Sequence, residues 1–186
     1  MHWKYLKAVL RHKKFVMLAG WGRVPFWRLI LHDWSKFTPR MWGPYARAFY
    51  GPKNRKTGKP DGDGAFDAAW LWHQQIERHH WQGWVLMEDS GKVHCLPMPH
   101  VYREEMLADW RGANRAYGDQ SLTDWYLRTA SARKLHPETR DWVEGQLGIG
   151  FCEECNRLAR IADACHGGCG LTGWPVESPL AAGGVE

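Results

Sequence analysis

The chain has 186 residues, 44% of them hydrophobic, and a net charge of +5 at pH 7. This size and apolar content predict one buried core and exclude a generally disordered protein. Basic residues are scattered except in two runs, at 11–14 and 53–59, so the charge favours small acidic ligands over nucleic acid. The apolar stretch 15–22 is short and lacks a cleavage site; we expect no secretion signal, no membrane partner and a cytoplasmic location.

The apolar spacing predicts a series of amphipathic helices, several of which begin at a proline, a residue tolerated in the first helical turn. The Gly/Pro-rich segment 51–64 predicts an exposed loop, and two short apolar pieces on either side of residues 89–92 predict a small inserted β-hairpin within 85–99. No alternation of strands and helices is found, so the expected fold class is all-α. The predicted helices cover residues 3–18, 24–37, 39–51, 66–84, 100–118, 122–135 and 137–148.

Four of these helices carry imidazole or carboxylate groups, which together suit divalent transition metals such as Mn, Fe, Co, Ni or Zn. Each group can also be explained without a metal. His12 can belong to a solvated basic face, His32-Asp33 to a helix end, His79-His80 to the surface, and Asp109 can be an ordinary helix carboxylate. A carboxylate near a helix C-terminus is disfavoured by the macrodipole, and a bound cation would compensate it. A helical bundle can bring such groups to one centre. The candidate residues are His12, His32, Asp33, His73, His79, His80 and Asp109.

His73 is considered separately because it precedes His80 by seven residues. On a continuous helix the two would share one face, about 10 Å apart along the axis. We therefore expect that they do not readily bind one ion. The two interpretations of His73 are a contact with substrate and a core histidine hydrogen-bonded to a neighbour.

The order His, His-Asp, His-His, Asp resembles the HD superfamily of metal-dependent phosphohydrolases. The segment "HDWSK" also resembles the His-Asp-x-x-Lys element of the cyclic-dinucleotide phosphodiesterase branch. The Gly-Tyr-Pro signature of that branch is missing after His80, and Ala8 stands in place of its extra glutamate, which disfavours a cyclic-dinucleotide substrate. "HDWSKF", "AWLWHQQIERHHWQGW", "EEMLADW" and "WYLRTASARKLHPETRDWVE" more closely resemble an uncharacterised family of HD-like proteins from bacteria and phages.

This resemblance implies an HD-type helical bundle that binds one or two metal ions, in the cytoplasm of a bacterium or a phage-infected host. The expected activity is hydrolysis of a nucleotide or other small phosphoester by a metal-activated water. The resemblance implies His12, His32, Asp33 and Asp109 as ligands of a first ion, with His79 and His80 candidates for a second ion or a substrate phosphate. It also implies Asp33, Lys36 and His80 as catalytic residues and Lys36 as a substrate-binding residue. Further substrate-binding candidates are His73 and, because they lie just after Asp109, Arg111 and Arg115.

Lys36 has a plainer interpretation as a cation near a helix C-terminus. Two other functions also remain open. One is a module that binds nucleic acid or protein, in which the metal is structural. The other is a di-iron HD-type oxygenase.

Four cysteines near the C-terminus form two close pairs, Cys152-x2-Cys155 and Cys165-x3-Cys169. Such pairs are typical of a structural zinc site, in which His166 can replace one cysteine. The alternative is a set of free or redox-active cysteines. We therefore predict an HD-like domain at 1–148, a Cys-rich zinc-binding appendage at 149–172 and a disordered tail at 173–186.

Overall fold

The computed structural model describes residues 1–52, 64–118, 121–152 and 157–161. This part of the chain is mostly helical, as predicted, and no helix in it is long and apolar enough to cross a membrane. The α-helices are α1 (His2–Gly20), α2 (Phe26–Leu31), α3 (Pro39–Tyr50), α4 (Ala65–Ile76), α5 (His100–Tyr117), α6 (Leu122–Thr129) and α7 (Pro137–Gln146). Three short 3-10 helices are η1 (Trp34–Phe37), η2 (Trp81–Trp84) and η3 (Ala130–Ala132).

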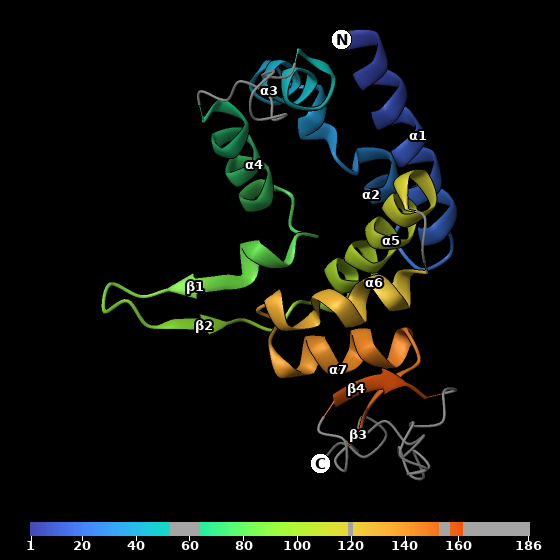
Figure 1. Cartoon of the computed structure of the whole chain (residues 1–186), viewed down its shortest axis with the longest axis vertical. Coiled ribbons are helices and arrows are strands. Elements are labelled where there is room, and N and C mark those ends of the chain that lie inside the picture. Colours follow the sequence, from blue (N-terminus) through green and yellow to red (C-terminus); the bar gives the residue numbers. More distant parts are fainter. Residues whose placement is uncertain (53–63, 119–120, 153–156, 162–186) are drawn as a thin grey trace.

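Two antiparallel hairpins accompany the helices. The first pairs β1 (Val85–Met87) with β2 (Val93–Cys95) and projects from the helical body (Figure 1), which confirms the hairpin expected within 85–99. The second pairs β3 (Ile149–Cys152) with β4 (Arg157–Arg160) beside α7. Sequence analysis did not predict strands there. Ile149 belongs to the same buried cluster as residues of α5, α6 and α7, so the second hairpin begins inside the helical core.

Three predicted helices are wrong in extent. The helix expected over 122–135 ends at Thr129 and is followed by η3, and the other two errors lie at the candidate site. The helix expected over 24–37 is interrupted: α2 ends at Leu31, Asp33 has a left-handed φ of 58°, and η1 follows. The helix expected over 66–84 ends at Ile76, after which the chain turns before entering η2. In both places the break lies beside metal-capable residues.

The close packing of α1 against α5 positions the two helices that carry His12 and Asp109. Gly112 of α5 lies against Val16 of α1, and a Cβ on this glycine would come within 2.5 Å of Val16 Cγ2 and 2.7 Å of its backbone nitrogen. Only glycine permits this approach. Val16 follows His12 by one helical turn and Gly112 follows Asp109 by three residues, so the contact holds the two candidate ligands near each other.

Candidate metal centre

The break after α2 presents His32 and Asp33 to the interior. Lys13 of α1 donates hydrogen bonds to the carbonyl oxygens of Ile30, at 2.9 Å, and of His32. These bonds satisfy carbonyl groups that the end of a helix leaves without partners. Aspartate tolerates the left-handed conformation better than most residues. As a result Asp33 is fully buried and His32 is 1% exposed.

A first group of potential ligand atoms surrounds one carboxylate oxygen of Asp33. His12 Nε2 lies 3.2 Å from Asp33 Oδ2 and 2.9 Å from Asp109 Oδ1. His32 Nε2 lies 3.4 Å from each of the same two oxygens. The four ligand atoms are within 4.8 Å of one another. The structure thus brings together the four residues that the family resemblance implied for a first ion.

A second group surrounds the other oxygen of Asp33. His73 Nε2 lies 3.2 Å from Asp33 Oδ1, and His79 Nε2 lies 3.7 Å from it. His80 Nε2 is 2.8 Å from His73 Nε2, so the expected separation of about 10 Å between His73 and His80 along a helix axis is wrong. Because α4 ends at Ile76, the chain folds back and His80 meets His73.

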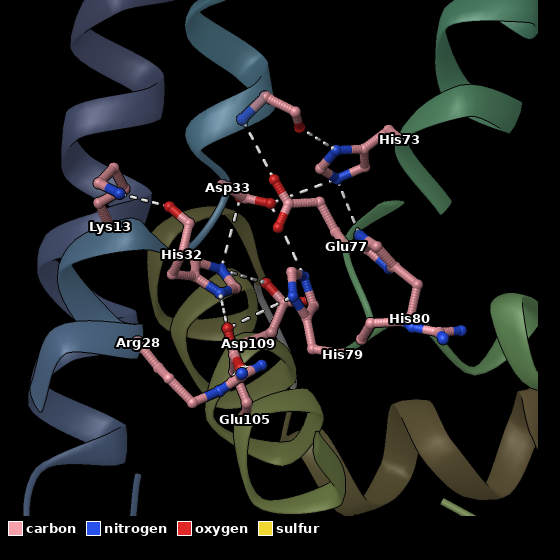
Figure 2. A network of polar contacts seen from close by, with 12 residues as sticks. Lys13, Arg28, His32, Asp33, His73, Glu77, His79, His80, Glu105 and Asp109 are labelled. Carbon is pink, nitrogen blue, oxygen red and sulfur yellow. Dashed lines mark hydrogen bonds and ion pairs between the residues drawn. The ribbon is translucent and has the colours of Figure 1, made fainter. Parts of the chain in front are cut away.

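Asp33 is therefore shared between the two groups, as Figure 2 shows, with His32 and His73 approaching it from opposite sides. Four of the potential ligand atoms are buried and lie at ion-pair distances, yet form no hydrogen bond of good geometry in the described part of the chain: His12 Nε2, His32 Nε2, His79 Nε2 and Asp33 Oδ1. Buried polar atoms without well-formed hydrogen bonds destabilise a fold. Two divalent ions, one on each side of Asp33, would satisfy all four atoms.

The pKa shifts divide the histidines in the same way. Burial lowers the pKa of His12 and His32, but the carboxylates of Asp33 and Asp109 outweigh it and raise both, that of His32 to about 10. Burial lowers the pKa of His73 and, with its histidine neighbours, that of His80 well below the usual value. Protons thus compensate the carboxylates at the first group, while His73 and His80 of the second group are neutral imidazoles, the form that binds metals.

The carboxylates are ionised despite their burial. Burial raises the pKa of Asp33, but Lys36 and His32 lower it further, to well below its usual value. The pKa of Asp109 is also lowered, by His12 and His32 against the effect of burial. The centre therefore offers one fully buried carboxylate, Asp33, one partly buried carboxylate, Asp109, and several imidazole groups to a cation.

The ring nitrogens that face away from Asp33 have their own partners. Ser35 Oγ lies 2.7 Å from His73 Nδ1. Glu105 Oε1 lies 3.2 Å from His32 Nδ1 and 3.5 Å from His79 Nδ1. Such contacts fix the tautomer and orientation of metal-binding histidines. The carboxylate of Glu105 keeps a proton on Nδ1 of His32 and of His79, so the Nε2 atoms of these two rings are the ones that can bind an ion beside Asp33.

Sequence reasoning missed Glu105, although it links the two groups. Its other oxygen, Oε2, accepts hydrogen bonds from Arg28 Nε at 2.8 Å and from Arg28 Nη2 at 2.5 Å. His32 and His79 lower the pKa of Glu105 below its usual range against the effect of burial. Its spacing of four residues before Asp109, on the same helix face, was a signal that could have identified it.

Two cavities open at the centre. The α1 chamber, of about 600 Å³, is lined by Tyr5, Ala8, Lys36, Tyr45, Phe49 and Tyr50, among others. The α6 chamber, of about 530 Å³, is lined by Trp81, Gln82, Leu122, Trp125, Ala132 and Arg133, among others. Both chambers are bounded by the same five residues, Trp70, His80, Asp109, Ala113 and Tyr117.

The predicted substrate-binding residues lie in different places. Lys36 lines the α1 chamber, and its Nζ is 2.6 Å from Asp33 Oδ2. His73 belongs to the second ligand group. Arg111 and Arg115 are not among the described residues that line either chamber; Arg115 instead lies over the ring of Phe15, 4.9 Å from its centroid.

The predicted zinc ligands of the appendage fall almost wholly outside the described residues. Cys155, Cys165 and Cys169 are in the undescribed segments, and only the backbone of Cys152 is described, at the end of β3. The zinc site stays a prediction.

Comparison with known proteins gives one match. The model of a family described as a family of unknown function (DUF5662) matches residues 1–149. No curated protein and no solved structure matches the chain. The matched segment includes every residue of the two ligand groups.

Proposed function

The chain belongs to this family of unknown function, DUF5662, and we propose from its centre that it is an HD-type phosphohydrolase that uses two divalent ions. Its substrate is a nucleotide or another small phosphoester. The observation that carries the proposal is the position of Asp33, whose two oxygens each face a separate group of histidines. A carboxylate shared in this way is suited to hold two ions close together, as two-metal phosphoesterases require.

His12, His32 and Asp109 would hold one ion with Asp33, and His73, His79 and His80 would hold the other. When bound, such ions lower the pKa of a water molecule and neutralise charge on a phosphoryl group. The order of these residues along the chain matches the HD pattern, which supports an HD-type bundle for the helical domain. The additional imidazole of His73 supplies the second group with a third histidine.

Lys36 is the cation of the chain closest to the shared carboxylate. Burial lowers its pKa, but Asp33 and Asp109 raise it above the usual value, so its ammonium group remains charged. Once ions neutralise Asp33, the ammonium is available to a phosphate in the α1 chamber, which it lines. A fixed positive charge there stabilises negative charge that develops during hydrolysis.

For the appendage we propose a structural zinc site formed by Cys152, Cys155, Cys165 and Cys169. Its support is the β3–β4 hairpin, whose register pairs Cys152 with Arg157. Cys152 stands at the end of β3, and its Cys-x2-Cys spacing to Cys155 is typical of a zinc-binding pair.

The first experiment measures metal content, which depends on no knowledge of the substrate. Elemental analysis would compare wild type with His12→Ala, His73→Ala and Asp33→Asn. Each histidine variant is expected to lose one ion, and Asp33→Asn to lose both, because only Asp33 belongs to both groups. Truncation after residue 150 is expected to remove zinc alone.

Turnover then tests the reaction class. A panel of phosphoesters with the metal-loaded protein is expected to yield a product that Asp33→Asn does not form. Unchanged metal content in Asp33→Asn would refute the two-ion centre. Retained metal without turnover, together with an oxygen-dependent absorption change of the iron-loaded protein, would indicate the oxygenase instead.

A further inference from the structure

We infer that the substrate is a phosphodiester with a planar group on each side of its phosphate, and that the α1 and α6 chambers each take one of these groups. This inference rests on the proposed function and narrows its substrate class. It begins from the position of the chambers, which share His80 and Asp109, one residue from each ligand group. The metal centre thus lies where the two chambers meet.

A phosphomonoester has one organic substituent and needs one chamber beside the metal ions. A phosphodiester has two, and both must leave the phosphate in different directions. Each chamber, at about 600 and 530 Å³, falls in the range of about 300–1,000 Å³ typical of pockets for small molecules. One chamber would be unused by a small monoester.

The α1 chamber is suited to a planar ring. Tyr5, Tyr45, Phe49 and Tyr50 line it, and aromatic side chains pack favourably on planar groups. The hydroxyl of Tyr45 is buried and so presents no polar surface to the chamber. The chamber therefore offers aromatic rings to a substituent, together with the ammonium group of Lys36.

The α6 chamber repeats these features with different residues. Trp81 and Trp125 line it, whereas Gln82 Oε1 is buried and not presented to the chamber. Arg133 lies 4.1 Å from the centroid of the Trp125 ring and forms no ion pair with any described carboxylate. Its Nη1 donates a hydrogen bond to Thr129 Oγ1, at 2.7 Å.

Together these groups define the substituent for the α6 chamber. The tryptophans offer planar surfaces and Arg133 offers N–H donors. A planar ring with acceptor atoms on its edge, such as a nucleobase, satisfies both. The α1 chamber, lined mainly by aromatic rings, accepts a wider range of planar groups.

The reaction on such a substrate is simple hydrolysis. The oxygen of one water molecule forms a bond to phosphorus, and the bond between phosphorus and the oxygen of one substituent breaks. One proton of the water passes to that oxygen, which leaves as an alcohol. The other remains on the new phosphomonoester, so no further reactant is needed.

The test compares two substrates with the same leaving group, bis(4-nitrophenyl) phosphate and 4-nitrophenyl phosphate, using wild-type protein loaded with Mn²⁺. We expect kcat/KM to favour the diester by roughly tenfold or more, because binding of the second substituent contributes to the transition state. Equal or better turnover of the monoester overturns the inference and leaves the proposed function intact. Turnover of neither substrate by metal-loaded protein overturns both.

Variants that fill one chamber test whether both chambers contribute to the preference for the diester. Ala8→Trp fills the α1 chamber and Ala132→Trp the α6 chamber, while Ala68→Trp on the exposed side of α4 is a matched control. Each filling variant is expected to reduce diester kcat/KM by roughly tenfold, with metal content unchanged, and the control to have no effect. Unaffected diester turnover in either filling variant would overturn the assignment of that chamber.

A binding measurement completes the test without relying on catalysis. Calorimetric titration of metal-free protein with bis(4-nitrophenyl) phosphate is expected to show weaker binding in both filling variants. If a tryptophan variant does not fold, Ala8→Leu and Ala132→Leu examine the same chambers with less added volume. These two are expected to weaken the binding of a dinucleoside monophosphate by several-fold, and wild-type affinity in both would overturn the inference.

Discussion

Replacement of Glu105 by glutamine is the sharpest test of how the centre is built. The change keeps the size of the side chain but removes the charge that lies beside His32 Nδ1 and His79 Nδ1. It also removes the carboxylate that accepts two hydrogen bonds from Arg28. Loss of such an outer partner typically reduces metal affinity by about 10–100-fold, or about 1.4–2.8 kcal/mol. Because Glu105 contacts one histidine of each group, both ions are expected to bind more weakly.

Competition with a chromophoric chelator would measure the two affinities. Glu104→Gln is a matched control, since Glu104 is the adjacent buried glutamate and its ion pairs, with Arg23 and His100, lie outside the ligand groups. The control is expected to bind metal like wild type. Wild-type affinity in Glu105→Gln, or an equal loss in Glu104→Gln, would refute the positioning role of Glu105.

Three further predictions follow from the geometry. Gly112→Leu is expected to destabilise the fold by at least about 1–3 kcal/mol, because its side chain would collide with the backbone of Val16; an unchanged denaturation midpoint would contradict this. Lys36→Gln is expected to retain both ions and lose turnover, measured by elemental analysis and a phosphoester assay; loss of metal would show a structural role. Metal affinity is expected to rise with pH, since the pKa values of His12 and His32 are raised in the metal-free protein and binding must release their protons. Calorimetry in buffers of different ionisation enthalpy measures that release, and a pH-independent affinity would contradict it.

The helices were predictable because their apolar periodicity is local, whereas their breaks depend on distant contacts. Nothing between Phe66 and Gln82 is a glycine or proline that would signal the end of α4 at Ile76. After that end, Glu77 Oε1 accepts a hydrogen bond from the backbone N–H of Ser35 at 3.1 Å. A contact between residues so far apart in sequence is invisible to a pattern of helical spacing.

The candidate site was predictable as a set of residue types but not as two groups. The order of histidines and aspartates identified its members, since each lies on a different segment that a bundle can bring together. The assumption of a continuous helix separated His73 from His80 and assigned His73 to substrate. Glu105 was overlooked because the adjacent Glu104 is chemically identical, and only the structure shows which carboxylate reaches His32.

The shared centre also has a consequence for how the chain folds. Its ligands join residue 12 to 32, residue 33 to 73, and residue 33 to 109, so bound ions would act as cross-links that close three loops of the chain. Closing loops by a metal reduces the conformational entropy of the unfolded state, and metal binding free energy becomes folding free energy. A chain that has not acquired its ions would open more often and meet proteases more often. The amount of this protein in a cell is therefore expected to follow the supply of its metal.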